Sequence, residues 1–63
     1  MEEFITEIKG NYDLFRQRVM DECIVTRQTF YSWSHGEPML EKYKPIINRI
    51  AMEIYGKKVF KDI

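Results

Sequence analysis

Apolar residues recur along this chain at spacings of three and four, the period of an α-helix that buries one face. Such runs occur in four places, and no stretch longer than a few residues alternates with the period of a strand. The first run is Phe4, Ile5 and Ile8, and Gly10-Asn11 after it is a typical helix stop. The pattern predicts a compact all-α fold of four helices in a single domain over residues 1–63.

The next two helices are predicted to follow closely on each other. Apolar residues continue the helical spacing from residue 12 to residue 23, and Asn11 is a candidate N-cap for this second helix. Thr26 can cap the third helix, because its hydroxyl can accept an otherwise unpaired N–H of the first turn. Gly36 should end the third helix in the left-handed conformation, with Pro38 just beyond it.

The fourth predicted helix has the broadest apolar face. Pro45 fits only within its first turn, where the missing N–H costs nothing, and Gly56 should end it. A short tail, residues 57–63, follows with Val59 and Phe60 as its apolar residues. The residues that define the apolar face are Tyr43, Ile46, Ile47, Ile50, Ala51 and Ile54.

The third segment is the one whose polar residues suggest a function. On a helical wheel Phe30 and Trp33 share one side, which predicts that they belong to the core. Arg27 lies on a flank at the first turn, where its long side chain can swing outward. Groups able to donate and accept hydrogen bonds occupy the opposite side, and such groups suit base edges in a major groove. These are Gln28, Tyr31, Ser32 and His35.

Composition limits the other functions open to the chain. The single cysteine, Cys23, excludes an internal disulfide, and together with the single histidine it cannot complete a zinc site. No carboxylate pair, catalytic triad or metal set stands out, so we expect neither an enzyme nor a cofactor, metal or small-molecule substrate. The acidic N-terminus lacks a long apolar run, which predicts no signal peptide, no membrane span and a cytoplasmic location.

The charges cancel overall but not along the chain. Ten basic and ten acidic side chains give a net charge of zero, which does not suggest a strong nucleic-acid field. Residues 1–26 carry six acidic and three basic side chains, a balance of −3, whereas residues 27–63 carry seven basic and four acidic ones, a balance of +3. A polarity of this kind could orient the molecule on an anion.

Residues 16–36 resemble the helix-turn-helix of the lambda repressor and Cro-like (XRE-type) superfamily, as found in small bacterial members. The run "VTRQTFYSWSHG", residues 25–36, is similar to their pattern hydrophobic–Ser/Thr–Arg–x–Thr–aromatic–x–x–Trp–x–x–Gly. The resemblance extends over residues 12–56. The matching apolar positions are Val19, Cys23, Val25, Phe30 and Trp33.

This resemblance implies sequence-specific binding of double-stranded DNA by a small transcriptional regulator. The helix over residues 26–34 would lie in the major groove. Arg27, Gln28 and Ser32 match positions that usually read bases. Positions that usually contact the DNA backbone match Arg16, at the opening of the preceding helix, and Thr26, Tyr31 and His35. Useful affinity would call for a homodimer, to which Val59, Phe60 or the fourth helix could contribute.

The chain departs from the family pattern in three respects. Met20 stands where a small residue is usual, and four helices replace five. Ile24 stands in the turn where glycine is favoured, and a β-branched residue is costly at positive φ. Either this turn has another geometry or its backbone is strained, and we expect a kept fold with a locally altered turn.

A function of another class is also compatible with these residues. A helix-turn-helix can serve as a protein–protein interaction module that does not bind DNA. The zero net charge and the aromatic residues Tyr31 and Trp33 favour this alternative.

Overall fold

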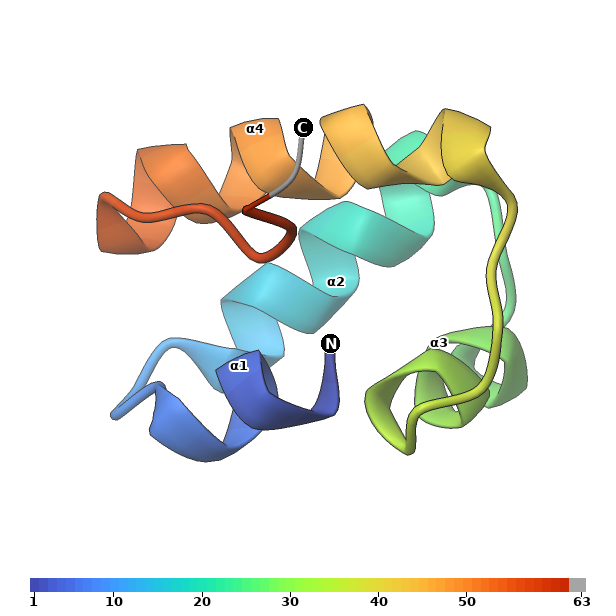
Figure 1. The fold of residues 1–63 in the computed structure, drawn as a ribbon, viewed down its shortest axis with the longest axis horizontal. Coiled ribbons are helices and arrows are strands. Elements are labelled where there is room, and N and C mark those ends of the chain that lie inside the picture. The colour runs from blue at the N-terminus through green and yellow to red at the C-terminus, as the bar shows by residue number, and fades with distance from the viewer. Residues whose placement is uncertain (62–63) are drawn as a thin grey trace.

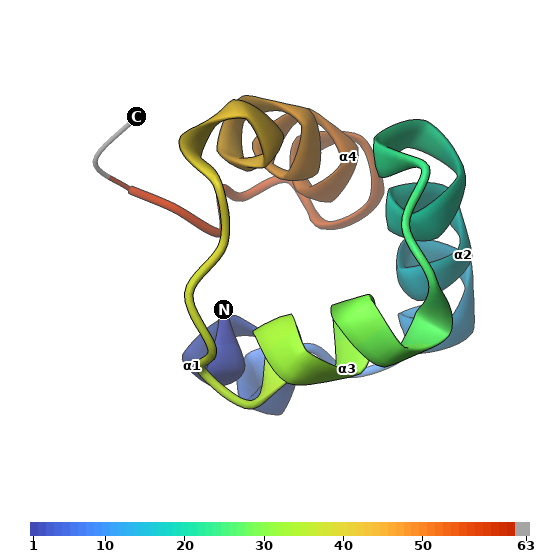
Figure 2. The same cartoon turned by 90° about the vertical axis from the view of Figure 1, so that its right-hand side faces the viewer.

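The computed structural model describes residues 1–61, and over that range the chain is helical with no strand. The elements are α1 (Glu2–Glu7), α2 (Tyr12–Cys23), α3 (Arg27–Ser34), the short 3-10 helix η1 (Glu41–Tyr43) and α4 (Lys44–Tyr55). Helix α2 runs between α4 on one side and the pair α1 and α3 on the other (Figure 1). The view turned by 90° shows α2 joining the α4 side of the molecule to the α3 side (Figure 2). The prediction of an all-α chain with four α-helices is therefore confirmed.

Phe15 of α2 is the centre of the core. Its ring centre lies 5.5 Å from that of Phe4, 6.2 Å from that of Phe30 and 5.8 Å from that of Tyr55, so aromatic side chains from all four helices meet here. Offset and edge-on ring pairs of this kind add to the stability that burial alone provides. The buried apolar residues are Phe4, Phe15, Val19, Cys23, Phe30, Trp33, Ile47, Ile50 and Ala51.

The connection between α1 and α2 differs from the sequence-based expectation in two ways. α1 ends at Glu7, because Ile8 is already extended, and so it stops before Gly10. Asn11 precedes α2 but makes no side-chain capping bond, so the prediction of a capping side chain is wrong. Asn11 has a left-handed backbone (φ 57°), whereas a residue that caps through its side chain has an extended one. Two consecutive positive φ angles, at Gly10 and Asn11, turn the chain from α1 into α2.

The two ends of α3 confirm the predictions made for them. Thr26 is extended, and its hydroxyl oxygen accepts a hydrogen bond from the Thr29 N–H at 3.3 Å. Gly36 follows the helix in the left-handed conformation (φ 89°), and the N–H of Glu37 donates to the carbonyl of Ser32 at 3.0 Å. This is the hydrogen-bonding pattern of a Schellman motif, which satisfies carbonyl groups at the helix end.

α4 also begins and ends as expected. Pro45 occupies its first turn, and Gly56 closes it with a left-handed backbone (φ 74°). After Gly56 the chain turns back, and Val59 and Phe60 are half-buried against the molecule's own core. The structure thus describes residues 57–61 of the predicted tail, and residues 62 and 63 lie outside the described range. No helix within residues 1–61 is long and apolar enough to cross a membrane.

Four charged side chains tie α2 to α4 through a closed ring of ion pairs. The guanidinium of Arg18 lies 3.0 Å from a carboxylate oxygen of Glu22 and 3.3 Å from a carboxylate oxygen of Glu53. Arg49 lies 3.1 Å from Glu53 and also pairs with Glu22. Each carboxylate is therefore shared between two guanidinium groups, and neither arginine is free to attract an anion.

Candidate nucleic-acid interface

Residues Ile24, Val25 and Thr26 connect α2 to α3. Ile24 has φ 55° and ψ 55°, which is the left-handed conformation. The N–H groups of both Ile24 and Val25 donate to the carbonyl of Met20, so this conformation satisfies an end group of α2. The expected altered turn is therefore wrong: the turn has the geometry that favours glycine, and an isoleucine carries the strain.

Phe30 and Trp33 determine which side of α3 faces outward. Phe30 is 1% exposed and Trp33 is 5% exposed, which confirms the prediction that both belong to the core. The Phe30 ring packs near Phe15 and Tyr12, while the Trp33 ring centre lies 5.1 Å from that of Tyr43. Because both ends of this apolar face are anchored, the helix presents its polar face to solvent in one orientation.

The three predicted base-reading residues differ in exposure. Arg27 and Gln28 are exposed on the first turn of α3, and neither has a hydrogen bond or ion pair from its side chain to any of residues 1–61. Ser32 is half-buried one turn further on. The exposed part of the predicted base-reading surface is thus the start of the helix.

Arg16 and Thr26, both predicted to contact the DNA backbone, make contacts within the molecule. Arg16 pairs with Asp13 at 3.3 Å and lies over the ring of Tyr12 at 5.6 Å, and its side chain is 22% exposed. α2 begins at Tyr12, so Arg16 lies in its second turn, and its expected position at the helix opening is wrong. The Thr26 hydroxyl serves as the cap of α3, 3.1 Å from the hydroxyl of Thr29.

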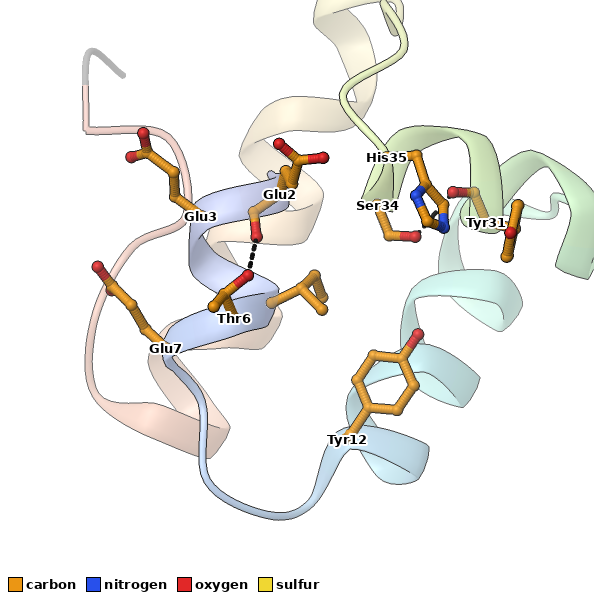
Figure 3. Close-up of a pocket in the computed structure, with 9 residues that line it drawn as sticks. Glu2, Glu3, Thr6, Glu7, Tyr12, Tyr31, Ser34 and His35 are labelled. Atoms are coloured by element: carbon orange, nitrogen blue, oxygen red, sulfur yellow. Dashed lines mark hydrogen bonds between the residues drawn. The ribbon is translucent and has the colours of Figure 1, made fainter.

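Tyr31 and His35, the other two predicted backbone contacts, lie on the second half of α3 and just beyond it. Their ring centres are 4.2 Å apart, and Tyr31 is 63% exposed. Both line a groove between α3 and α1 (Figure 3). The wall of the groove across from them is formed by α1, whose residues Glu2, Glu3 and Glu7 place carboxylates on that side. The side chains of Glu3 and Glu7 point away from α3 (Figure 3).

The polar surface along α3 is therefore divided by charge. Its first turn carries the free guanidinium of Arg27, and its C-terminal end faces the acidic helix α1. Sequence reasoning missed this arrangement, because nothing in the spacing of apolar residues indicates that α1 packs beside α3. The balance of −3 over residues 1–26 was the one available signal.

The side chains of Lys42, just before α4, and Lys44, at its start, both contact neighbouring side chains. Lys44 pairs with Glu41 at 3.0 Å and lies 5.4 Å from the ring centre of Phe60. Lys42 lies over the ring of Tyr43 at 5.1 Å. The ammonium groups of Lys42 and Lys44 therefore do not form a continuous set of unpaired cations with Arg27.

The described part of the chain holds no cluster of three or more metal-ligating side chains. Cys23 is buried in the core, and this burial raises the pKa of its thiol above the ordinary value. Comparison of the chain with models of protein families, with curated proteins and with solved structures gave no match. The first turn of α3 and the groove beside its other end are two surface features with different chemistry.

Proposed function

We propose that this protein binds double-stranded DNA through the first turn of α3 and acts as a small transcriptional regulator in the cytoplasm. In this proposal α2, the connection Ile24–Thr26 and α3 are a helix-turn-helix of the lambda repressor and Cro-like kind. The observation that carries it is the exposure of Arg27 and Gln28, without partners in residues 1–61, on a helix whose opposite face is fully buried.

The chemistry of that first turn suits a DNA major groove. An arginine fork can bind both acceptors of a guanine, and a glutamine amide can pair with the donor and acceptor of an adenine. The backbone N–H groups of Arg27 and Gln28 have no acceptor within the described chain, so they are available to a phosphate oxygen. Base reading and phosphate binding would then occur side by side.

The second half of α3 would contribute less. Carboxylates of α1 near Tyr31 and His35 repel phosphates, and Ser32 is half-buried. A single reading turn gives little contact area, so a dimer with its two reading helices about 34 Å apart would supply the missing affinity.

The test is a titration of a fluorescein-labelled duplex with the full chain, followed by fluorescence anisotropy at rising salt concentration. Binding through phosphates should weaken steeply as salt rises, because bound counterions are released from the DNA. Arg27→Ala should lower the affinity for duplexes selected from a random pool by roughly tenfold and remove the sequence preference at one base pair.

Lys9→Ala is the matched control. Lys9 is an exposed cation in the connection between α1 and α2, it makes no ion pair within residues 1–61, and its removal changes the net charge by the same amount. If both variants lose affinity equally, Arg27 makes no specific contact. If the unmodified chain binds no duplex even at low salt, the helix pair acts as a protein interaction module instead.

A further inference from the structure

The groove between α1 and α3 has a volume of about 630 Å³. The ring of Tyr12 projects from the start of α2 into the space between the two helices (Figure 3). Ile5 of α1 adds an apolar surface, and Tyr31 and His35 form the opposite wall. A hollow of this size can hold one or two large side chains.

Three acidic residues, Glu2, Glu3 and Glu7, line the groove. The carboxylate of Glu7 is already paired with Lys57 at 3.3 Å. The side chains of Glu2 and Glu3 are exposed and have no ion pair within residues 1–61. Glu2 and Glu3 therefore bring two carboxylates without an ion pair to this edge, and no lysine or arginine is among the residues that line the groove. Lys57, Lys58 and Lys61 line a neighbouring hollow on the other side of Glu3 and Glu7.

Aromatic faces accompany these carboxylates. Tyr31 is held in place by its contact with His35, at 4.2 Å between ring centres, although most of its surface is exposed. Tyr12 already has a guanidinium, that of Arg16, 5.6 Å from its ring centre. Tyrosine faces attract cations, and carboxylates bind guanidinium groups through two hydrogen bonds.

We propose that this groove binds the arginine side chains of a basic, extended segment of a partner protein. Charge complementarity selects this occupant, because an arginine combines a delocalised cation, a planar fork for the carboxylates and a flat face for the tyrosine rings. An anionic partner is disfavoured by the same carboxylates. The groove goes beyond the proposed DNA contact, since it lies at the other end of α3 and uses different residues.

Binding of a fluorescein-labelled hexa-arginine peptide to the full chain at 50 mM salt tests the proposal. Glu2→Gln/Glu3→Gln should weaken this binding by about fivefold, because two exposed ion pairs are lost. Asp21→Asn/Glu37→Gln is the matched control: both carboxylates are exposed, make no ion pair within residues 1–61 and do not line the groove, so the affinity should change by less than twofold. Equal losses in the two double variants would show diffuse attraction and overturn the proposal.

Tyr31→Ala provides a second variant in case the glutamine substitutions disturb the short helix α1. Its exposed ring can be removed without opening the core, and the peptide affinity should fall by about threefold. Unchanged affinity in both this variant and the glutamine variant, with helical circular dichroism retained, would overturn the proposal.

The peptide proposal and the DNA proposal can be refuted independently of each other. Glu2→Gln/Glu3→Gln should leave duplex affinity at least as high as in the unmodified chain, and Arg27→Ala should leave peptide affinity within twofold. Analytical ultracentrifugation of the protein alone tests whether a second copy of the chain fills the groove instead. A dimer that Glu2→Gln/Glu3→Gln dissociates would assign the groove to a second copy of the chain and overturn the partner-protein proposal.

Discussion

The side chain of Asn48 and the backbone of Phe60 hydrogen-bond to each other in both directions. Asn48 Nδ2 donates to the Phe60 carbonyl at 2.9 Å, and the Phe60 N–H donates to Asn48 Oδ1 at 2.7 Å. The same Oδ1 accepts the N–H of Val59 at 2.9 Å. Asn48 is only 6% exposed, so one buried amide of α4 substitutes for the backbone partners that the tail would have in a helix or sheet.

Asn48→Ala should therefore lower the free energy of unfolding by about 2 kcal/mol, because it leaves two backbone N–H groups of the tail without an acceptor in a half-buried place. Urea unfolding followed by circular dichroism measures the change. Met52→Ala, on the exposed side of the same helix, is the control and should change stability little. A loss below about 0.5 kcal/mol for Asn48→Ala would mean that water replaces the amide without penalty.

Ile24→Gly should raise the free energy of unfolding by about 1 kcal/mol. A β-branched residue in the left-handed conformation is strained, and glycine is not. The isoleucine side chain is 87% exposed, so little burial is lost with it. Thermal unfolding compares this variant with Ile24→Val, which keeps the branching and should show no gain. If the glycine variant were less stable than the unmodified chain, the backbone of Ile24 would not be strained in the native structure.

Stability should decline on the alkaline side. Burial raises the pKa of the Cys23 thiol and of the Tyr55 hydroxyl. Both groups are neutral when protonated, so their contribution to the free energy of unfolding is complete below their ordinary pKa values. It is lost as the pH rises above the ordinary pKa of each group and through the raised value.

Tyr55→Phe separates the two groups. Urea unfolding between pH 9 and pH 11 should show a shallower decline in this variant, because the contribution of the Tyr55 hydroxyl has been removed. The variant also loses the bond from the Tyr55 hydroxyl to the Gly10 carbonyl (2.8 Å), so its stability at pH 7 provides the reference. Parallel declines in the variant and the unmodified chain would exclude Tyr55 as a source of the alkaline loss.

Trp33→Ala should cost about 3–5 kcal/mol, as truncations of buried aromatic residues do. A domain of this size has little stability to spare, so the variant should be largely unfolded at 37 °C. Near-ultraviolet and far-ultraviolet circular dichroism measure the loss. Tyr31→Phe, two residues earlier on the exposed face, should remain folded. A folded Trp33→Ala variant would mean that α3 is held by Phe30 alone.

Local residue chemistry was enough to predict the four helices and the ends of α3 and α4, but not the end of α1 or the start of α2. The cap at Thr26 and the stops at Gly36 and Gly56 depend on one or two neighbouring backbone groups, so the residue types indicate them directly. Phe30 and Trp33 were predicted as core residues because helical spacing places them on one side.

Features that depend on contacts between distant segments were not predictable. Asn48 lies among apolar neighbours on α4, and only the returning tail explains its burial. The acidic groove requires α1 to pack on α3, and Arg16 is engaged by Asp13 and Tyr12 rather than free. At Ile24 the backbone bonds at the end of α2 outweighed the steric preference of the residue, which reasoning from residue type alone does not weigh.

Within these 63 residues, α1 is synthesised before the residues on which its packing depends. α1 has six residues, too few to be stable by itself. Its Phe4 ring packs 5.5 Å from the ring of Tyr55, and Glu7 pairs with Lys57. Until α4 and the following residues have left the ribosome, α1 lacks these partners, and the groove that it forms with α3 cannot be completed.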